Sequence, residues 1–155
     1  MPAQVWVDAD ACPAAIRDIL CRAAQRAGCS TTFVANHGIA LPRSPYLAFR
    51  QVAQGFDVAD NVIAREAAAG DLVVTQDIPL AAAVVERGAD AVSPRGERFT
   101  PDNVKARLAM RDFMTGLRDS GVVTGGPPPL DATDRQRLAN VLDRWLARRG
   151  VGNGG

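Results

Sequence analysis

A short apolar run that ends in two carboxylates constrains the fold of this chain more than any other stretch. Residues 5–7 are apolar and predict a strand buried on both faces. Asp8 and Asp10 end that strand, and Pro13 then opens a helical pattern because its fixed φ suits the first helical position. A strand, an acidic tip and a helix form the first unit of an α/β sheet, in which ligands bind beyond the carboxyl ends of the strands. Two carboxylates placed there repel each other unless a cation lies between them or one takes up a proton.

Strand and helix patterns alternate along the rest of the chain. Further strands are expected at 30–35, 47–53, 71–75 and 89–93, and helices at 13–27, 57–69, 79–87, 102–120 and from about 131 onward. The alternation predicts βαβ units in an α/β fold with a mostly parallel sheet. The right-handed crossover rule then places helices on both faces of that sheet, as in a three-layer, doubly wound α/β/α domain.

Length and composition are those of one soluble globular domain. The 155 residues are 47% apolar and 23% charged, and we expect a single domain over 1–148 with a flexible glycine-rich tail at 149–155. The net charge of +1 creates no overall attraction to nucleic acid or membrane, so such binding would need a local patch. No stretch reaches the roughly 20 apolar residues of a membrane span, and no secretion signal opens the chain. A cytoplasmic location is therefore expected, in keeping with three cysteines that lack metal-ligand spacing.

Three groups of acidic residues mark the candidate site. Asp8 and Asp10 end the first strand, Asp77 ends the fourth, and Asp57 and Asp60 lie in the first turn of the helix after the third. If the first and fourth strands are neighbours, their acids converge at one edge of the sheet. Carboxylate oxygens suit Mg²⁺ or Mn²⁺, which can activate water and stabilise an in-line phosphoryl displacement.

Structural roles compete with this interpretation. Asp57 and Asp60 could instead favour the helix dipole by about 0.3–1 kcal/mol each, and Asp77 could cap a helix. Asp8 is harder to explain structurally, because an ionised group at a buried strand end is costly unless it is compensated. Cys12 is expected at a helix N-cap, where a reactive thiol is conceivable, but the nearby aspartates disfavour its thiolate.

Basic residues near the same edge are candidate phosphate contacts. Arg95 follows the fifth strand, and Arg107 and Arg111 share one face of the long helix. Arginine forks match phosphate oxygens well, although solvated faces and surface ion pairs are the commoner explanation. His37, the single histidine, is expected to be structural or solvated.

Six longer motifs resemble one known family. They are, in chain order, residues 5–13 (VWVDADACP), 55–61 (GFDVADN), 75–81 (TQDIPLA), 94–97 (PRGE), 111–114 (RDFM) and 124–127 (TGGP). Together they resemble the YaiI/YqxD family of bacterial proteins up to about Leu146. The resemblance implies a PIN-like fold related to the PIN and NYN nucleases, in which acids at the ends of the first and fourth strands and at an intervening helix start bind Mg²⁺ or Mn²⁺ and cut RNA. Asp8 and Asp77 match the two strand-end acids, and Asp57 or Asp60 the intermediate one.

Three functions follow as hypotheses. The leading one is a metal-dependent phosphodiesterase acting on RNA, with the ion held by Asp8, Asp10 and Asp77, a further ligand or base from Asp57 or Asp60, and substrate contacts from Arg95 and Arg111. A haloacid-dehalogenase-type phosphatase is the second, with Asp8 as nucleophile and Thr75 as its second motif, but it needs a lysine and Lys105 is the only one. The third is a non-catalytic RNA- or protein-binding module with a structural ion. The oligomeric state is left open.

Overall fold

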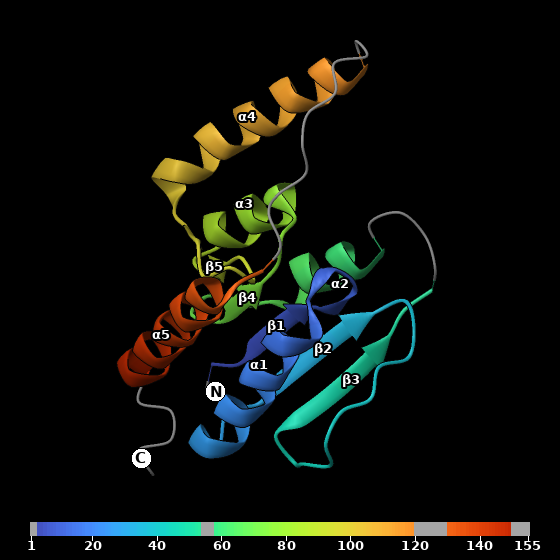
Figure 1. The fold of residues 1–155 in the computed structure, drawn as a ribbon, viewed down its shortest axis with the longest axis vertical. Coiled ribbons are helices and arrows are strands. Elements are labelled where there is room, and N and C mark those ends of the chain that lie inside the picture. Colours follow the sequence, from blue (N-terminus) through green and yellow to red (C-terminus); the bar gives the residue numbers. More distant parts are fainter. Residues whose placement is uncertain (1–2, 54–57, 120–129, 150–155) are drawn as a thin grey trace.

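The structure is a computed structural model that describes residues 3–53, 58–119 and 130–149. It describes their side chains except those of residues 11, 58–61, 111–112, 114–119 and 149. In this part of the chain six strands form one sheet in the order β3-β2-β1-β4-β5-β6 (Figure 1). The strands are β1 (Val5–Asp8), β2 (Thr31–Ala35), β3 (Leu47–Gln51), β4 (Leu72–Val74), β5 (Asp90–Val92) and β6 (Arg98–Phe99).

The sheet is mostly parallel, as the alternation of elements predicted. The first five strands pair in parallel, and β6 pairs antiparallel with β5. The sequence pattern did not predict β6, because a two-residue strand is too short to show a period. It forms where the turn at Pro94–Gly96 reverses the chain beside β5, with the amide of Ser93 donating to the carbonyl of Glu97.

Helices join the strands in the predicted order. They are a 3₁₀ turn η1 (Ala9–Ala11) and the helices α1 (Ala14–Ala27), α2 (Val58–Glu66), α3 (Ile78–Glu86), α4 (Pro101–Asp119) and α5 (Ala132–Arg149). Two details of the first helix correct the prediction. Pro13 is the N-cap in extended backbone rather than the first helical residue, and Cys12 lies before it rather than at the cap. Residues 9–11, directly after β1, form the turn η1. The helix α1 therefore begins at Ala14, one residue after Pro13.

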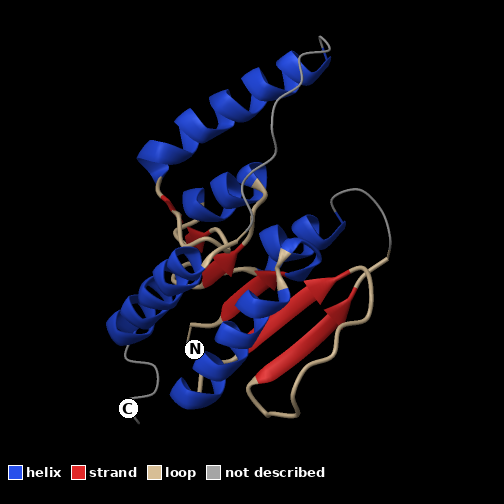
Figure 2. Cartoon of the chain, viewed as in Figure 1, coloured by secondary structure: helices blue, strands red, loops and turns tan. Residues whose placement is uncertain are grey.

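Helices cover the sheet (Figure 2), and two apolar cores lie on its two faces. Side chains alternate along β1, so that Val5 and Val7 face one core and Trp6 faces the other. The first core holds the buried sides of α1 and α5, including Trp145, whereas the second holds those of α2 and α3. α4 packs on α3, away from the sheet (Figure 1). The predicted placement of helices on both faces is therefore confirmed.

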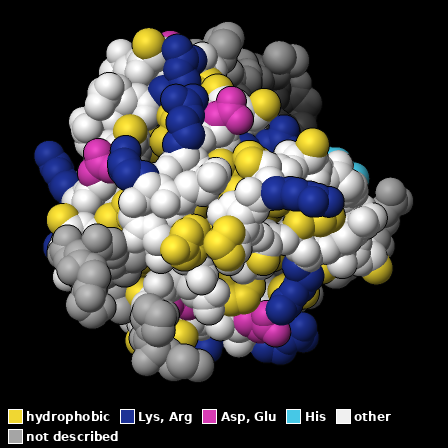
Figure 3. Space-filling model, turned by 90° about the horizontal axis from the view of Figure 1, so that it is seen from below, with side chains coloured by type: hydrophobic (Ala, Val, Ile, Leu, Met, Phe, Trp, Pro, Cys, Tyr) yellow, Lys and Arg dark blue, Asp and Glu magenta, His cyan; other side chains and the backbone are white. Residues whose placement is uncertain are grey.

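The exterior is mixed in charge. Lys and Arg side chains are spread over the face seen in Figure 3, with apolar patches and fewer acidic side chains between them. Within the described ranges no helix combines the length and apolarity needed to cross a bilayer. The predicted flexible tail lies outside the described residues from position 150 onward.

Candidate functional site

The topology predicts a crevice at the carboxyl ends of β1 and β4. These two strands are neighbours, in the register Val5 with Leu72 through Val7 with Val74. The chain leaves β1 toward α1 on one face of the sheet and leaves β4 toward α3 on the other. Loops that diverge in this way from adjacent strands leave a crevice between them, the usual ligand position in open α/β sheets. The condition on which the acids were expected to converge is therefore met.

The hydroxyl of Thr75 links the carboxylate of Asp8 to the backbone N–H of Asp77. The hydroxyl of Thr75 donates to Oδ2 of Asp8 at 2.9 Å, and the backbone N–H of Asp77 donates to the same hydroxyl oxygen at 3.0 Å. Asp8 is only 7% exposed. Oδ1 of Asp77 accepts the backbone N–H of Leu80 at 2.9 Å and so caps α3. Asp77 thus has the structural role that the sequence allowed, and its backbone N–H shares the Thr75 hydroxyl with Asp8.

Asp10 faces the opposite side of β1. Both of its carboxylate oxygens accept the backbone N–H of Asn36, at 3.0 and 3.1 Å, just beyond the end of β2. Nδ1 of His37 lies 2.9 Å from Oδ1 of Asp10. The structure therefore directs Asp10 toward β2, whereas Asp8 contacts Thr75 at the end of β4. His37, expected to be structural or solvated, is largely exposed and belongs to this contact.

Three predicted site residues have side chains outside the described part of the structure. Asp57 is not described at all, whereas Asp60 lies in α2 and Arg111 in α4, without described side chains. α2 packs against the core that contains Trp6 of β1, so the helix that holds Asp60 is adjacent to the central strands. The roles of all three remain predictions.

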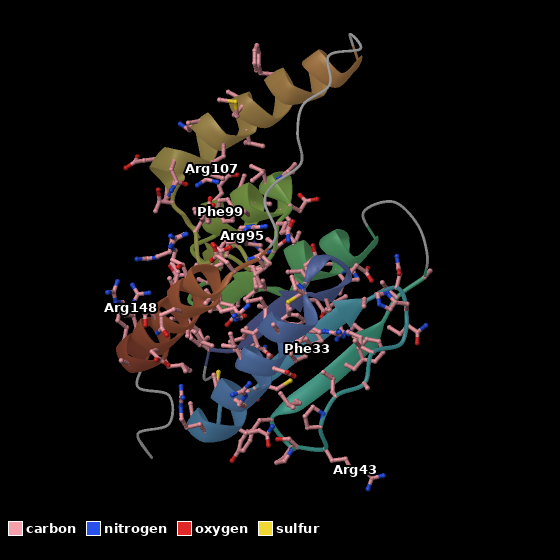
Figure 4. The ribbon with its side chains drawn as sticks, viewed as in Figure 1. Phe33, Arg43, Arg95, Phe99, Arg107 and Arg148 are labelled. Carbon is pink, nitrogen blue, oxygen red and sulfur yellow. The ribbon has the colours of Figure 1, made fainter. Side chains whose placement is uncertain are left out.

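Arg95 is held at the start of α5 rather than projecting into solvent (Figure 4). Its Nη1 lies 2.7 Å from Oδ2 of Asp134, and both side chains are largely buried. Asp134 and Asp131 each accept the other's backbone N–H, which closes the first turn of α5. The backbone N–H of Asp134 is the main cause that lowers the pKa of Asp131, and the positive charge of Arg95 lowers it further. If Arg95 binds substrate, its guanidinium must contact a phosphate oxygen while it is paired with Asp134.

Cys12 is a buried thiol close to the acids. Burial is the main reason that its pKa rises to about 12; the Asp8 carboxylate raises it further and Arg17 opposes the rise. The thiol is therefore protonated near neutral pH, and its structural interpretation is favoured over a reactive one.

Two residues near the site were not recognised in these roles from the sequence. Thr75 was considered only as a phosphatase motif, but it bridges Asp8 and Asp77. Arg17, in the first turns of α1, acts electrostatically on Cys12, and within the described residues its buried Nε has no hydrogen-bond partner. The signal for Thr75 was its position two residues before Asp77 at a strand end.

Metal binding by these residues stays a prediction. Among the side chains that the structure describes, no group of three His, Cys, Asp or Glu could hold a metal. Mg²⁺ is usually held by one or two carboxylates together with water and substrate phosphates, so Asp8 and Asp77 would be the candidate ligands among the described acids.

The only lysine lies elsewhere. Lys105 is on α4 and lines a hollow of about 410 Å³ between α3 and α4, together with Val85, Val104 and Leu108. α4 contacts α3 rather than the sheet, so this amine belongs to a different layer from Asp8. The position disfavours the phosphatase alternative, which needs the lysine beside its nucleophile.

Comparisons with known proteins agree with the sequence motifs. The family model described as "Uncharacterized BCR, YaiI/YqxD family" matches residues 6–148. A UPF0178 protein of Marinobacter nauticus is 59% identical over 144 residues, which are 93% of this chain and 96% of the relative. One from Halorhodospira halophila is 62% identical over 146 residues, which are 94% of this chain and 97% of the relative. No solved structure matches the chain significantly.

Proposed function

We propose that this chain, which belongs to the YaiI/YqxD family, is a metal-dependent phosphodiesterase with a PIN-like fold that cuts RNA. The observation that supports this most strongly is the contact chain from Asp8 through Thr75 to Asp77 at the crevice between β1 and β4. In it, the buried carboxylate of Asp8 and the backbone N–H of Asp77 share the Thr75 hydroxyl beyond the strand ends, which are the usual ligand position of such a sheet. The helices on both faces of a mostly parallel sheet are compatible with the PIN-like assignment.

Each residue has a distinct task in this mechanism. Asp8 and Asp77 would hold Mg²⁺ or Mn²⁺, with Asp10 as a further acid on the β2 side. A metal bound there would supply activation of water and stabilisation of the charge that develops on the phosphate. Thr75 fixes the orientation of the Asp8 carboxylate through its hydroxyl. The Asp57 or Asp60 carboxylate serves as a further ligand or as the base that orients water, while Arg95 and Arg111 contact substrate phosphates.

The test is metal-dependent cleavage of a single-stranded RNA oligonucleotide. Purified protein should cut the RNA with Mn²⁺ or Mg²⁺, lose that activity in EDTA, and recover it when metal is restored. Cleavage that persists in EDTA would contradict the proposal. Stabilisation by Mg²⁺ without any cleavage would favour the non-catalytic binding module instead.

The phosphatase alternative has its own discriminating result. It requires a covalent phosphoryl group on Asp8, which a phosphate-mimicking fluoride complex would trap in a stoichiometric, metal-dependent complex. The proposal here predicts no aspartyl-phosphate on Asp8, because water is the nucleophile. Detection of that adduct by mass spectrometry would reverse the assignment.

A further inference from the structure

A groove runs between α1 and α5 and begins near the proposed site. The two helices lie side by side and run in the same direction (Figure 1). α1 follows β1 closely, and the start of α5 is tied to Arg95 after β5, so both N-termini lie at the carboxyl edge of the sheet. Two adjoining hollows of about 490 and 200 Å³ occupy the space between the helices, sharing Ile19, Arg22 and Ala139.

Small residues and arginines line this α1–α5 groove. Ala15 and Ala132, near the two helix starts, open its upper end, and Ala23 and Leu142 lie farther along. The charged lining residues are Asp18, Arg22, Arg26, Arg135 and Asp143.

Two of the arginines make no ion pair within the described residues. Arg26 pairs with Asp143 at 2.8 Å, which joins the helices at the lower end. In the described part of the chain, neither Arg22 nor Arg135 makes an ion pair or a side-chain hydrogen bond, although Asp18 lies in the same groove. Unpaired guanidinium forks in a groove match phosphate oxygens.

We propose that the α1–α5 groove binds the phosphate backbone of a single-stranded RNA, with Arg22 and Arg135 as its phosphate contacts. This inference rests on the proposed function, since the bound strand would continue from the groove to the Asp8 crevice. Ala15 and Arg22 are separated by about 10 Å along α1. The positive ends of both helix dipoles lie at the upper end, where they add to the attraction for an anion.

The shape of the groove favours this occupant. A membrane needs a flat or convex apolar surface, and an amphipathic peptide helix needs large apolar anchors, whereas this lining is mostly alanine and charge. A channel between two packed helices admits a single strand more readily than a duplex. An acidic protein segment is the remaining competitor.

Measuring RNA binding without metal tests the groove independently of RNA cleavage. A fluorescein-labelled 12-nucleotide single-stranded RNA is titrated in EDTA and its anisotropy recorded over a series of salt concentrations. The double variant R22A/R135A should bind about 10-fold more weakly, with a salt slope reduced by roughly 1.4, because about 0.7 is lost for each single-strand phosphate contact. The matched control, R43A/R65A, removes two exposed arginines elsewhere, one of which projects from the β2–β3 loop (Figure 4). It should bind within twofold of the wild type.

The outcomes distinguish failure of this inference from failure of the proposed function. Hydrolysis of bis(p-nitrophenyl) phosphate with Mn²⁺ needs the crevice but not the groove, so R22A/R135A should retain it. If hydrolysis is present but both double variants bind RNA alike, the groove assignment is wrong and the phosphodiesterase stands. If R22A/R135A alone weakens RNA binding but no hydrolysis occurs, the groove assignment is supported and the phosphodiesterase assignment is wrong. Equal or tighter binding of a polyglutamate peptide at the same arginines would assign the groove to an acidic protein instead.

Discussion

Two buried carboxylates lie at opposite ends of the same pair of strands, and their surroundings differ. Asp71, just before β4, is 4% exposed and accepts three N–H groups, from the backbones of Gln4 and Ala68 and from the indole of Trp6, at 3.0–3.1 Å. Asp8, at the end of β1, is 7% exposed and accepts the hydroxyl of Thr75. The first carboxylate ties three segments together at the amino edge of the sheet. The second lies at the carboxyl edge with Asp10 and Asp77 in adjoining loops.

The comparison shows that burial of a carboxylate does not by itself mark a functional site. A buried acid that receives several neutral donors from distant segments is explained by the hydrogen bonds it satisfies. A buried acid that lies close to other acids at a topological switch point calls for a cation. The distinction predicts opposite consequences for substitutions at the two ends.

The largest effect is expected for Asp8→Asn. The asparagine can still accept the Thr75 hydrogen bond, and one of several like charges is removed, so the free energy of unfolding should change by less than about 1 kcal/mol. Mn²⁺-dependent RNA cleavage should fall by about 10²–10³-fold, because a metal contributes several kcal/mol of transition-state stabilisation. Initial rates and urea unfolding measure the two quantities. Unchanged cleavage would reject the proposed function.

The reverse pattern is expected for Asp71→Ala. One buried and two partly buried N–H groups would lose their acceptor, which should lower the free energy of unfolding by about 3 kcal/mol and the melting temperature by roughly 6–12 °C. Cleavage per folded molecule should stay within twofold of the wild type at a temperature where the variant is folded. A large loss of cleavage without a loss of stability would contradict the structural role assigned to Asp71.

Asp77 combines both roles, and two substitutions separate them. Asparagine caps helices about as well as aspartate, so Asp77→Asn should change the free energy of unfolding by less than about 0.5 kcal/mol, whereas Asp77→Ala should cost about 1 kcal/mol. Both should raise the Mn²⁺ concentration needed for half-maximal cleavage by roughly 10–100-fold, the range typical of groups that support a metal site. If only the alanine variant impairs cleavage, Asp77 is a cap and nothing more.

The smallest effect is expected at Cys12. Burial holds the pKa of its folded thiol at about 12 against an ordinary value of 9.0, so the folded state retains a proton that the unfolded state loses. Its contribution to stability is therefore complete below pH 9 and is lost as the pH rises from 9 toward 12. Urea midpoints at pH 8 and pH 10 should fall less in Cys12→Ala than in the wild type. If the urea midpoint falls equally in both proteins, ionisation of the Cys12 thiol does not cause the loss of stability at alkaline pH.

Local patterns predicted most of the fold. The apolar run before Asp8 gave a central strand, Gly28 ended α1 in a left-handed conformation (φ 67°), and the proline after Asp77 lies at the start of a capped helix. The errors lie where local signals are weak or overlap, as with the two-residue β6 and the 3₁₀ turn that displaced Pro13 from the helix. The family resemblance was confirmed over residues 6–148.

The site was predicted less completely, for a physical reason. The sequence indicated that Asp8 and Asp77 end strands, but their meeting depended on β1 and β4 being neighbours. It gave no sign that Asp10 turns toward Asn36, that Arg95 pairs with Asp134, or that Thr75 joins the acids. These contacts join residues 26, 39 and 67 positions apart, which no local period reports.

The chain by itself determined which segments become strands and helices and which residues are acidic at their ends, because side-chain period, capping and proline geometry act within a few residues. Tertiary structure alone decided which groups surround each acid. Asp8 and Asp71 are both acids next to buried strands of the same sheet. Asp71 accepts N–H groups from three segments at the amino edge, whereas Asp8 accepts the hydroxyl of Thr75 at the carboxyl edge, because the strand order sets β1 beside β4.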